Sequence, residues 1–498
     1  MPAYNANVLA QATSAVNRAD PRGRPMIHVG LLSFSDGRPQ VHEALAPDIR
    51  QHQHDIIARL DASGEVAVAP GEDIVHSNAS ARDQAARLAA LRLDACIFSV
   101  PVFPFPNYAV IAAQVLGRTP LLLLGPHDPR YPGLTGLLAV GGALDQIGVR
   151  HERLWLDMND PAAVPRMLTF LRAAAAATRL RGQVYGLVGG RSIGMSTGAA
   201  PAERWQQQFG VDVDHVDEAE ILRRAALVPA EDVRAAREWI ERRVPPIAFD
   251  GSQLTPEKWD LEVRCHIALT QVVEESGFDF VGLKCHFEMS GFHCVQCMSA
   301  AFMNDPYDWR GPKAPVPLAC EADSDGALTM QMLHLVSDRP ACLLDVRFFD
   351  REKGVYVMPN CGSAPTWFAA RSDDPDENLR HVRVVPAITK YAGGGAHIRF
   401  VFRPGELTLA RLTRSPSGYR MFVARGEAIA LDPDDVVGAG PGWPHAFVRL
   451  PIAPDDLVQT LQANHLHAVA GDYRGELLAL CRLLDVEPVI VNPSAERG

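Results

Sequence analysis

Residues 26–34, MIHVGLLSF, form an apolar run of strand length that opens a regular alternation along the chain. An amphipathic pattern over residues 46–61 follows it, and the next apolar run is EVAVAP at 65–70. Two further runs, DACIFSV at 94–100 and TPLLLLG at 119–125, are each preceded by another helical stretch. Alternation of short apolar runs with helical patterns is typical of parallel strands joined by helical crossovers. The sequence therefore predicts that the chain begins with a doubly wound α/β domain.

A second α/β domain is predicted to follow the first. The alanine-rich helix RMLTFLRAAAAATRLRG, at 166–182, closes the first domain, to which we assign residues 26–180. A new apolar run, VYGLVGG at 184–190, then opens a second domain over residues 181–349. The later runs FDFVGL and PVPLACEA are expected to join the same parallel sheet.

The pattern changes after about Asp350. Short β-rich runs such as KGVYVMP, HIRFVFRPGELTLARLTR and YRMFVARGEAIAL are separated by turn residues, with only two clear helices near the end. This pattern predicts a mostly antiparallel sheet or barrel over residues 350–498. The predicted fold class is therefore α/β, with two doubly wound parallel-sheet domains followed by a β-rich, barrel-like C-terminal domain. Residues 1–25 are expected to form a flexible N-terminal arm.

Composition limits the kinds of partner that the protein can have. The chain has 498 residues, 47% of them apolar, which is enough for two or three hydrophobic cores. A formal net charge of −11 argues against nucleic acid or an anionic membrane as the main partner and favours a small neutral substrate. No stretch approaches the roughly 20 apolar residues of a membrane span, and residues 1–25 lack the features of a secretory signal. Nine scattered cysteines suit a reducing compartment, so a cytoplasmic location is expected.

Three metal-ligand residues stand out late in the chain: Glu321 in ACEADSDGALTM, Asp345 in ACLLDVRFFD and His465 in QANHLHAVAGDY. Each acid lies in or just after an apolar run that is expected to be a buried strand. A carboxylate there is costly unless a cation or a catalytic role compensates it. Asp323 and Ser324 resemble N-cap residues of a following helix, which places Glu321 at the carboxyl end of a strand. Open α/β sheets bind their ligands at that end.

Structural explanations compete with this interpretation. Asp345 could pair with Arg347 two residues later, and His465 could belong to a loop in which it only satisfies backbone groups. Two carboxylates and an imidazole nevertheless form a ligand set that suits Mn²⁺ or Mg²⁺ and leaves positions open for water or substrate oxygens. We therefore interpret Glu321, Asp345 and His465 as a candidate metal site.

The same segments resemble those of the L-fucose isomerase family, within the larger group that also contains the L-arabinose isomerases. ACEADSDGALTM resembles the family's strand with a metal-ligating glutamate, LLDVRFF resembles its strand with the second metal carboxylate, and ANH in QANHLH resembles its Asn-His metal loop. Weaker similarities are DGR at 36–38, GGRSIGMSTG near Met195, NCGSA at 360–364 and YAGGG from Tyr391. The resemblance extends over nearly the whole chain.

This resemblance implies an aldose–ketose isomerase with Mn²⁺, or with Mg²⁺ or another divalent cation, at Glu321, Asp345 and His465. It implies an enediol mechanism in which Glu321 and Asp345 also transfer protons, without saying which acid moves which proton. It further implies a homo-oligomer, a trimer, tetramer or hexamer, whose active site is completed by neighbouring subunits. L-Fucose, D-arabinose, a related pentose and a modified hexose all remain open as the sugar.

Eight residues are candidates for contacts with the sugar. They are Arg38, Met195, Lys284, His286, Tyr391, Trp443, Asn464 and His467. Four of these candidates, Arg38, Met195, Tyr391 and Trp443, rest on weaker similarities, and a methionine or an aromatic side chain more often belongs to a core. Among the four we prefer Arg38 and Tyr391. Asn464 is placed to hydrogen-bond sugar hydroxyls, and His467 is either a partner of the metal ligands or a substrate contact.

The segment KCHFEMSGFHCVQCMSAAFMNDPYDW departs from the family pattern, in which polar glutamine and arginine groups are expected near residues 284–287. The simplest interpretation is that Lys284 or His286 faces the sugar. A structural zinc held by Cys294, Cys297 and adjacent histidines is an alternative, because Zn²⁺ favours sulfur and nitrogen ligands.

Two other functions remain open on the sequence alone. A non-catalytic sugar-binding or sensory protein could close two α/β domains around a ligand, but it has no need of two buried acids and a histidine poised for a metal. A zinc hydrolase centred on residues 285–297 lacks a local His-Glu-x-x-His arrangement. Sugar isomerisation is therefore the preferred hypothesis.

Overall fold

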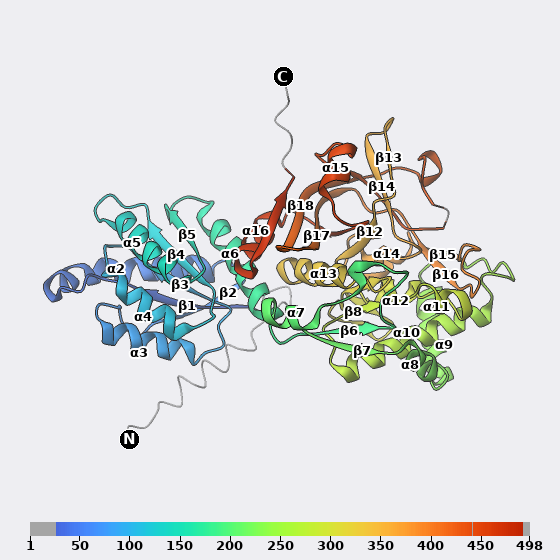
Figure 1. Cartoon of the computed structure of the whole chain (residues 1–498), viewed down its shortest axis with the longest axis horizontal. Coiled ribbons are helices and arrows are strands. Elements are labelled where there is room, and N and C mark those ends of the chain that lie inside the picture. Colours follow the sequence, from blue (N-terminus) through green and yellow to red (C-terminus); the bar gives the residue numbers. More distant parts are fainter. Residues whose placement is uncertain (1–25, 441, 492–498) are drawn as a thin grey trace. The chain divides into compact units, whose positions relative to one another are not determined.

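The computed structural model describes residues 26–440 and 442–491 and divides the chain into two compact units (Figure 1). Of the described residues, the first unit contains 26–179 and 478–484, and the second contains 180–440, 442–477 and 485–491. The expected N-terminal arm, residues 1–25, lies outside the described residues. Within the described ranges, no helix is long and apolar enough to cross a membrane.

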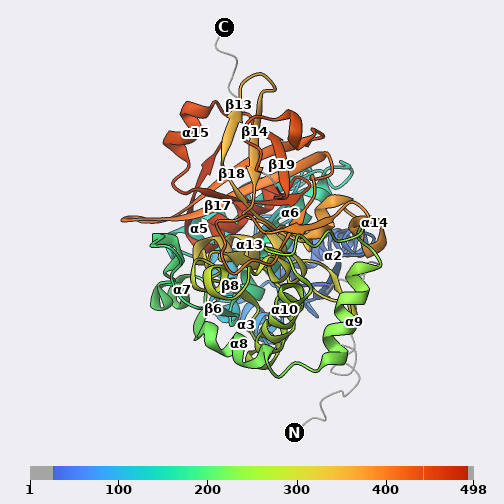
Figure 2. The same ribbon diagram turned by 90° about the vertical axis from the view of Figure 1, so that its right-hand side faces the viewer.

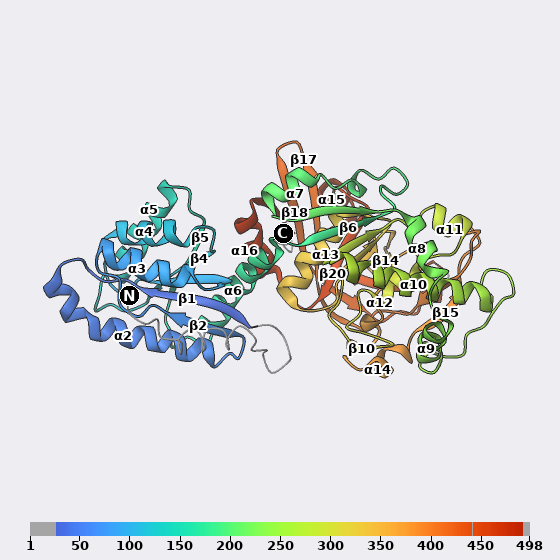
Figure 3. The same cartoon turned by 90° about the horizontal axis from the view of Figure 1, so that it is seen from below.

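A five-stranded parallel sheet forms the centre of the first unit, in the order β2-β1-β3-β4-β5. Its strands are β1 Ile27–Ser33, β2 Val66–Pro70, β3 Ala95–Ser99, β4 Leu121–Pro126 and β5 His151–Leu156. The helices are α2 Pro39–Asp61, α3 Asn78–Ala89, α4 Pro106–Leu116, α5 Gly133–Gln146 and α6 Ala163–Leu180. Helix α2 lies on one face of the sheet, whereas α3, α4 and α5 pack on the other (Figure 3). The predicted doubly wound fold of this part is confirmed.

The second unit begins with a four-stranded parallel sheet in the order β11-β8-β6-β7. Its strands are β6 Val184–Val188, β7 Asp212–Val216, β8 Phe280–Leu283 and β11 Leu318–Cys320. The order reverses beside β6 as it does beside β1 in the first sheet, so the two sheets are wound in the same way. The expected place of FDFVGL and PVPLACEA in this sheet is confirmed. Strand β7 is an edge strand with largely exposed side chains, which explains its polar sequence, DVDHV.

Seven helices accompany this second parallel sheet in the chain. They are α7 Ala202–Gln208, α8 Glu218–Ala225, α9 Ala230–Glu241, α10 Pro256–Ser276, α11 Glu288–Phe292, α12 Cys297–Phe302 and α13 Ser324–Ser337. A short antiparallel pair, β9 Tyr307–Asp308 and β10 Gly311–Pro312, precedes β11.

An antiparallel sheet forms the rest of the second unit, in the order β12-β20-β17-β18-β19-β14-β13, and β21 pairs with β18 in parallel. Its strands are β12 Cys342–Asp345, β13 Phe348–Asp350, β14 Val355–Pro359, β17 Gly405–Ser415, β18 Gly418–Ile429, β19 His445–Arg449, β20 His465–Ala470 and β21 Val486–Ile490. Outside it lie the hairpin β15 Arg383–Pro386 and β16 Ala396–Arg399 and the helices α14 Pro375–Leu379, α15 Pro454–Thr460 and α16 Arg474–Leu484. The predicted β-rich C-terminal region is confirmed.

One strand falls on an unexpected side of the predicted domain boundary. Strand β12 precedes residue 350, yet it pairs with β20 and so belongs to the antiparallel sheet. Asp345 is therefore carried by the antiparallel sheet, whereas Glu321 follows a strand of the parallel sheet. The boundary at residues 349 and 350 stays a prediction, because both sheets lie within one compact unit.

Helix α13 is enclosed between the two sheets of the second unit. It contacts β8 and β11 of the parallel sheet and β12, β17 and β20 of the antiparallel sheet (Figure 2). Nearly all of its residues are buried. A helix buried on every side needs apolar residues around its whole circumference, which explains the sequence GALTMQMLHLV. Glu321 lies just before the first turn of this helix.

A buried carboxyl group links α10 to the YAGGG segment. Glu262 is fully buried and accepts hydrogen bonds from the backbone N–H groups of Met298, at 3.0 Å, and Ala396, at 2.7 Å. Gly395 has φ of +116°, and a Cβ atom there would lie 2.8 Å from Glu262 Oε2. Glycine is therefore needed at position 395. Burial of the Glu262 carboxyl group raises its pKa to about 8.

Titration of Glu262 should make the stability of this unit depend on pH. The pKa is raised in the folded state, so the folded protein holds the proton more tightly, and stability falls as the pH rises from about 4.5 to about 8. The expected loss is about 1.4 kcal/mol for each pH unit in that range. Glu262→Gln should remove this part of the pH dependence in urea unfolding curves, whereas Glu274→Gln, near the end of the same helix, should keep it. Equal pH profiles for the two variants would contradict the assignment.

Candidate functional site

Glu321 lies at the point where the chain turns from β11 into α13. Glu321 and Ala322 both adopt left-handed backbone conformations, with φ of +60° and +49°. Non-glycine residues persist in this region only where the surrounding structure enforces it, and such residues cluster at functional sites. The side chain of Glu321 is buried at the carboxyl end of β11, as the sequence predicts.

His465 and Asp345 face Glu321 from the antiparallel sheet. The two residues are register partners on the adjacent strands β20 and β12. The Nε2 atom of His465 lies 3.3 Å from Oδ1 of Asp345 and 3.7 Å from Oε2 of Glu321. The three predicted metal ligands therefore meet around one imidazole nitrogen.

Asp323 holds His465 in place from behind. Its Oδ2 lies 2.7 Å from Nδ1 of His465, and its Oδ1 accepts hydrogen bonds from Arg411 at 3.1 Å and from the backbone N–H of Gly326 at 3.0 Å. The side chains of Asp323, Arg411 and His465 are fully buried. A Cβ atom at Gly326 would lie 2.6 Å from Nε2 of His467 and 2.8 Å from the Asp323 carboxyl group. Glycine at this position thus gives the carboxylate room.

The local charges explain the protonation of these groups. Burial opposes ionisation of Asp323, but the charge of Arg411 and the hydrogen bonds from His465 and Arg411 outweigh it and hold the pKa of Asp323 well below its usual range. Burial alone would lower the pKa of His465, but the nearby carboxylates of Asp323 and Asp345 raise it to about 10. Burial also raises the pKa of Glu321, with His465 acting in the opposite direction and Asp345 adding to the rise.

The donor set fits a divalent cation. Among the described residues, Nε2 of His465 is buried without a hydrogen-bond partner, although two carboxylates lie nearby. Those carboxylates favour the protonated ring, and a cation bound there would replace the proton on Nε2 while Nδ1–H stays donated to Asp323. A histidine oriented by a carboxylate behind it is the usual arrangement of a metal ligand. A cation bound by Glu321, Asp345 and His465 would satisfy the buried nitrogen and neutralise both acids.

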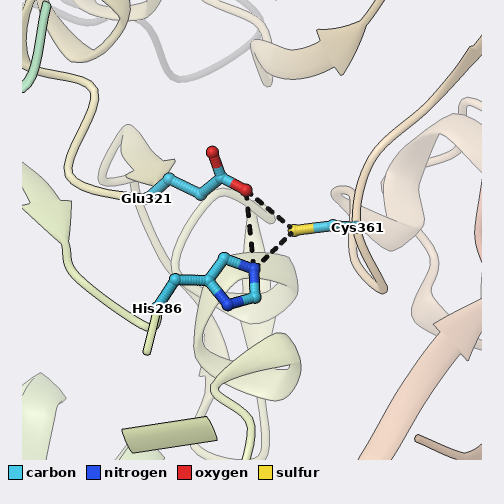
Figure 4. Close-up of side chains that lie close together, drawn as sticks. All are labelled: His286, Glu321 and Cys361. Atoms are coloured by element: carbon cyan, nitrogen blue, oxygen red, sulfur yellow. Dashed lines mark hydrogen bonds and ion pairs between the residues drawn. The ribbon is translucent and has the colours of Figure 1, made fainter. Parts of the chain in front are cut away.

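A second group of side chains approaches Glu321 from the other side (Figure 4). Oε1 of Glu321 lies 3.5 Å from Nε2 of His286 and 3.5 Å from Sγ of Cys361, and these two atoms are 3.7 Å apart. The ring of His286 stacks on Tyr391 with centroids 5.0 Å apart, and the Tyr391 hydroxyl lies 3.4 Å from the same nitrogen. Burial, followed by the charge of Lys390, lowers the pKa of His286 to about 4.

The other sugar-contact candidates of the second unit differ in their surroundings. Trp443 is buried, with the guanidinium of Arg347 4.9 Å from its ring centroid. Asn464 is exposed beside His465, and its carbonyl accepts a hydrogen bond from Val346. Met195 is partly buried in the loop after β6.

Two further candidates of the second unit lie outside the group of side chains around Glu321, and a third candidate belongs to the first unit. Lys284 forms a 2.8 Å ion pair with Glu288 and lines a separate pocket of about 530 Å³ at the ends of β6 and β7. His467 is fully buried against Gly326, and neither of its ring nitrogens has a hydrogen-bond partner among the described residues. Arg38 belongs to the first unit, where it pairs with Asp36 at 2.7 Å. The roles of all eight candidates stay predictions.

The two cysteines of the alternative zinc site turn to different neighbours. Sγ of Cys294 lies 4.0 Å from Sγ of Cys265, and Sγ of Cys297 lies 3.3 Å from Nδ1 of His397. In the part of the chain that the structure describes, Cys361 and not these cysteines joins a histidine and a carboxylate.

Sequence reasoning missed three residues of the site. Asp323 was interpreted only as an N-cap, although the same carboxylate also orients His465. Arg411 could have been noticed as a charged residue inside the apolar strand GELTLARLTRS, where burial demands a partner. Cys361 lies in the NCGSA segment, which carried a weak similarity but no chemical assignment.

Removing the charge of Asp323 should weaken cation binding. Asp323→Asn leaves the buried Arg411 without its anion and loosens His465, so we expect an affinity for Mn²⁺ that is about 10- to 100-fold lower and a stability loss of about 3–5 kcal/mol. Asp325→Asn is the matched control, because it removes a buried carboxylate of the same turn that pairs with Arg414 and not with His465. Mn²⁺ titrations followed by electron paramagnetic resonance would test this, and equal affinity in both variants would contradict the assigned role.

Two family models match the chain. The model described as L-fucose isomerase, first N-terminal domain, matches residues 26–182. The model described as L-fucose isomerase, C-terminal domain, matches residues 358–491. The second match contains His465 and Cys361, and the first corresponds to the first doubly wound sheet.

Curated relatives cover most of the chain. An L-fucose isomerase from Haemophilus influenzae is 24% identical in an alignment that covers 80% of each protein. An L-fucose isomerase from Phocaeicola vulgatus is 26% identical, covering 75% of this chain and 77% of that protein. A sulfoquinovose isomerase from Clostridium sp. (strain MSTE9) is 24% identical, covering 76% and 83%. The chain belongs to the L-fucose isomerase family and is an aldose–ketose isomerase of sugars.

Proposed function

We propose that this isomerase depends on a divalent cation held by Glu321, Asp345 and His465 and acts on a fucose- or arabinose-like sugar by enediol proton transfer. The observation that carries the proposal is the convergence of the Glu321 and Asp345 carboxylates on Nε2 of His465, a buried nitrogen without a hydrogen-bond partner among the described residues. Mn²⁺ is the cation that we favour, and Mg²⁺ suits the same mixed oxygen and nitrogen ligands.

The chain's own residues divide the remaining work. A cation held by Glu321, Asp345 and His465 would supply Lewis-acid chemistry that makes the C2 proton of the sugar easier to remove. Glu321 and Asp345 transfer protons, one between C2 and C1 and the other at the hydroxyl groups. His286, beside Oε1 of Glu321, and Tyr391, whose hydroxyl lies 3.4 Å from Nε2 of His286, would orient the sugar.

Loss of either acid should abolish turnover. Glu321→Gln and Asp345→Asn each remove a charged ligand and a proton carrier, so kcat should fall by about 10³-fold or more, while the circular dichroism spectrum stays that of the wild type. Glu288→Gln, whose carboxylate pairs with Lys284, is the control. Wild-type activity with normal metal content in either variant would disprove this mechanism.

Assays of several sugars with the purified protein are the direct test of the reaction. Metal-stripped protein given Mn²⁺, Mg²⁺ or Zn²⁺ should convert one pentose or 6-deoxyhexose to its ketose, with the highest rate in Mn²⁺. Conversion that is equally fast without added metal and in the presence of a chelator would contradict metal dependence. Measurement of the protein's mass in solution in the same samples tests the expected trimer, tetramer or hexamer.

Two cations favour an anionic sugar as a second candidate substrate. Lys390 and Arg347 are exposed and lie 5.8 Å and 4.9 Å from the ring centroid of Trp443. Neither forms an ion pair with any carboxylate among the described residues, and Lys390 is adjacent to Tyr391, which stacks on His286. A sulfonate or carboxylate on the sugar carbon farthest from the cation site would supply the missing partner. The similarity to a protein named sulfoquinovose isomerase supports a test of this substrate class.

Charge removal at Lys390 should separate the two substrate classes. Lys390→Gln should raise KM for a sulfonated hexose about 10-fold or more, because a hydrogen bond to a charged group contributes about 1.5–3 kcal/mol, and it should leave KM for L-fucose nearly unchanged. Lys353→Gln, in the turn between β13 and β14, is the control. A proportional change in KM for both sugars would count against an anion subsite.

A further inference from the structure

The two oxygens of Glu321 face two different sets of ligand atoms. Oε2 is directed at His465, within the cation site already described. Oε1 is directed at Nε2 of His286 and Sγ of Cys361, and Figure 4 shows these three side chains pointing toward one another. One carboxylate therefore belongs to two groups that could each hold a cation.

The spacing of the second group matches the edges of a zinc tetrahedron. Bond lengths of about 2.3 Å to sulfur, 2.05 Å to nitrogen and 2.1 Å to oxygen, with tetrahedral angles, require edges of about 3.4 Å for N···O and about 3.6 Å for both S···N and S···O. The corresponding distances are 3.5 Å from His286 to Glu321, 3.7 Å from Cys361 to His286 and 3.5 Å from Cys361 to Glu321. All three agree within the roughly 0.2 Å expected of a metal site.

The supporting contacts orient the ligand atoms. Nδ1 of His286 lies 3.3 Å from the Ser290 hydroxyl, so Nδ1 can carry the ring proton and Nε2 can present its lone pair to a metal, although the Tyr391 hydroxyl lies 3.4 Å from Nε2. The backbone N–H of Cys361 donates to Oδ1 of Asn360 at 2.7 Å. The next residue, Gly362, has φ of +109° and lies so close to His397 that a Cβ atom would be 2.2 Å from its Nδ1. This hydrogen bond and the close packing of Gly362 against His397 therefore fix the loop that carries Cys361.

We propose that His286, Glu321 and Cys361 form a second cation position, selective for thiophilic Zn²⁺, that is joined through the Glu321 carboxylate to the position at Asp345 and His465. Thiolate, imidazole and carboxylate suit Zn²⁺, whereas hard cations such as Mn²⁺ and Mg²⁺ prefer sites without sulfur. Zn²⁺ binding breaks the S–H bond of Cys361, releases that proton to solvent and forms a zinc–sulfur bond. Three protein ligands leave a fourth position open for water or a sugar oxygen.

The inference rests on the proposed function only because both cation positions use Glu321. Zn²⁺ would occupy Nε2 of His286, so it would take this nitrogen from the sugar. Cys320 allows a matched control. Its sulfur lies 3.9 Å from that of Cys361, but among the described residues only Cys361 forms a cluster of possible metal ligands with His286 and Glu321. Substitution of either cysteine removes one thiol from the same neighbourhood, and only one of them is a ligand.

Co²⁺ is the probe that makes a thiolate ligand visible. Metal-stripped full-length protein titrated with Co²⁺ should develop a thiolate-to-cobalt charge-transfer band in the near ultraviolet, and one equivalent of Zn²⁺ should abolish it. The band should be lost in Cys361→Ser and kept in Cys320→Ser. No band in the wild type, or the same band in Cys361→Ser, would overturn the proposal. Loss of the band in Cys320→Ser, with the band kept in Cys361→Ser, would show that Cys320 is the thiolate ligand and would also overturn the proposal.

Asp345→Asn separates this inference from the isomerase mechanism. The variant lacks a ligand of the first cation position but retains all three of the second, so it should lose Mn²⁺ binding measured by electron paramagnetic resonance and keep the cobalt band. If Asp345→Asn keeps full activity while the band depends on Cys361, the proposed mechanism fails and the second cation position stands. If the band is absent while Asp345→Asn is inactive, the second position fails and the mechanism stands. Far-ultraviolet circular dichroism of each variant checks that the fold is retained.

Discussion

The buried contact of Asp323 with Arg411 and His465 is the constraint on which the site depends. Asp323 caps α13, Arg411 belongs to β17 and His465 to β20, so one carboxylate joins three segments of the second unit. Replacement of such an ion pair by apolar groups is often neutral or stabilising, and its contribution here is to geometry rather than to net stability. It holds the imidazole so that Nε2 faces Glu321 and Asp345.

Glu321 can face both sheets because of the backbone around it. The left-handed conformations at Glu321 and Ala322 turn the chain sharply at the end of β11. The parallel sheet thereby supplies Glu321 and, after β8, His286, while the antiparallel sheet supplies Asp345 and His465. In the proposed mechanism, the two acids and the cation would act on one sugar from these two sources. Helix α13, buried between the sheets, sets the distance between the two sources.

Most of the strands could be predicted from the sequence. A strand buried on both faces shows a continuous run of apolar residues, and a strand buried on one face shows alternating apolar and polar residues. The edge strand β7 could not, since its exposed side chains carry no apolar pattern. Strand β12 was placed with the parallel sheet because sequence order alone does not tell which sheet an apolar run will join. Asp323 was predicted as a helix cap and proved to be one, but its second task depends on contacts that local sequence does not record.

The sequence by itself determined the order and type of most elements and singled out Glu321, Asp345 and His465 as candidate ligands, because periodicity and the cost of burying a carboxylate act locally. The tertiary structure alone decided that Oε2 of Glu321 faces His465 while Oε1 faces His286 and Cys361. These contacts join residues far apart in the chain, and the pairing of β12 with β20 sets part of their geometry. A shift of one residue in that pairing would turn every side chain of the strand to the opposite face.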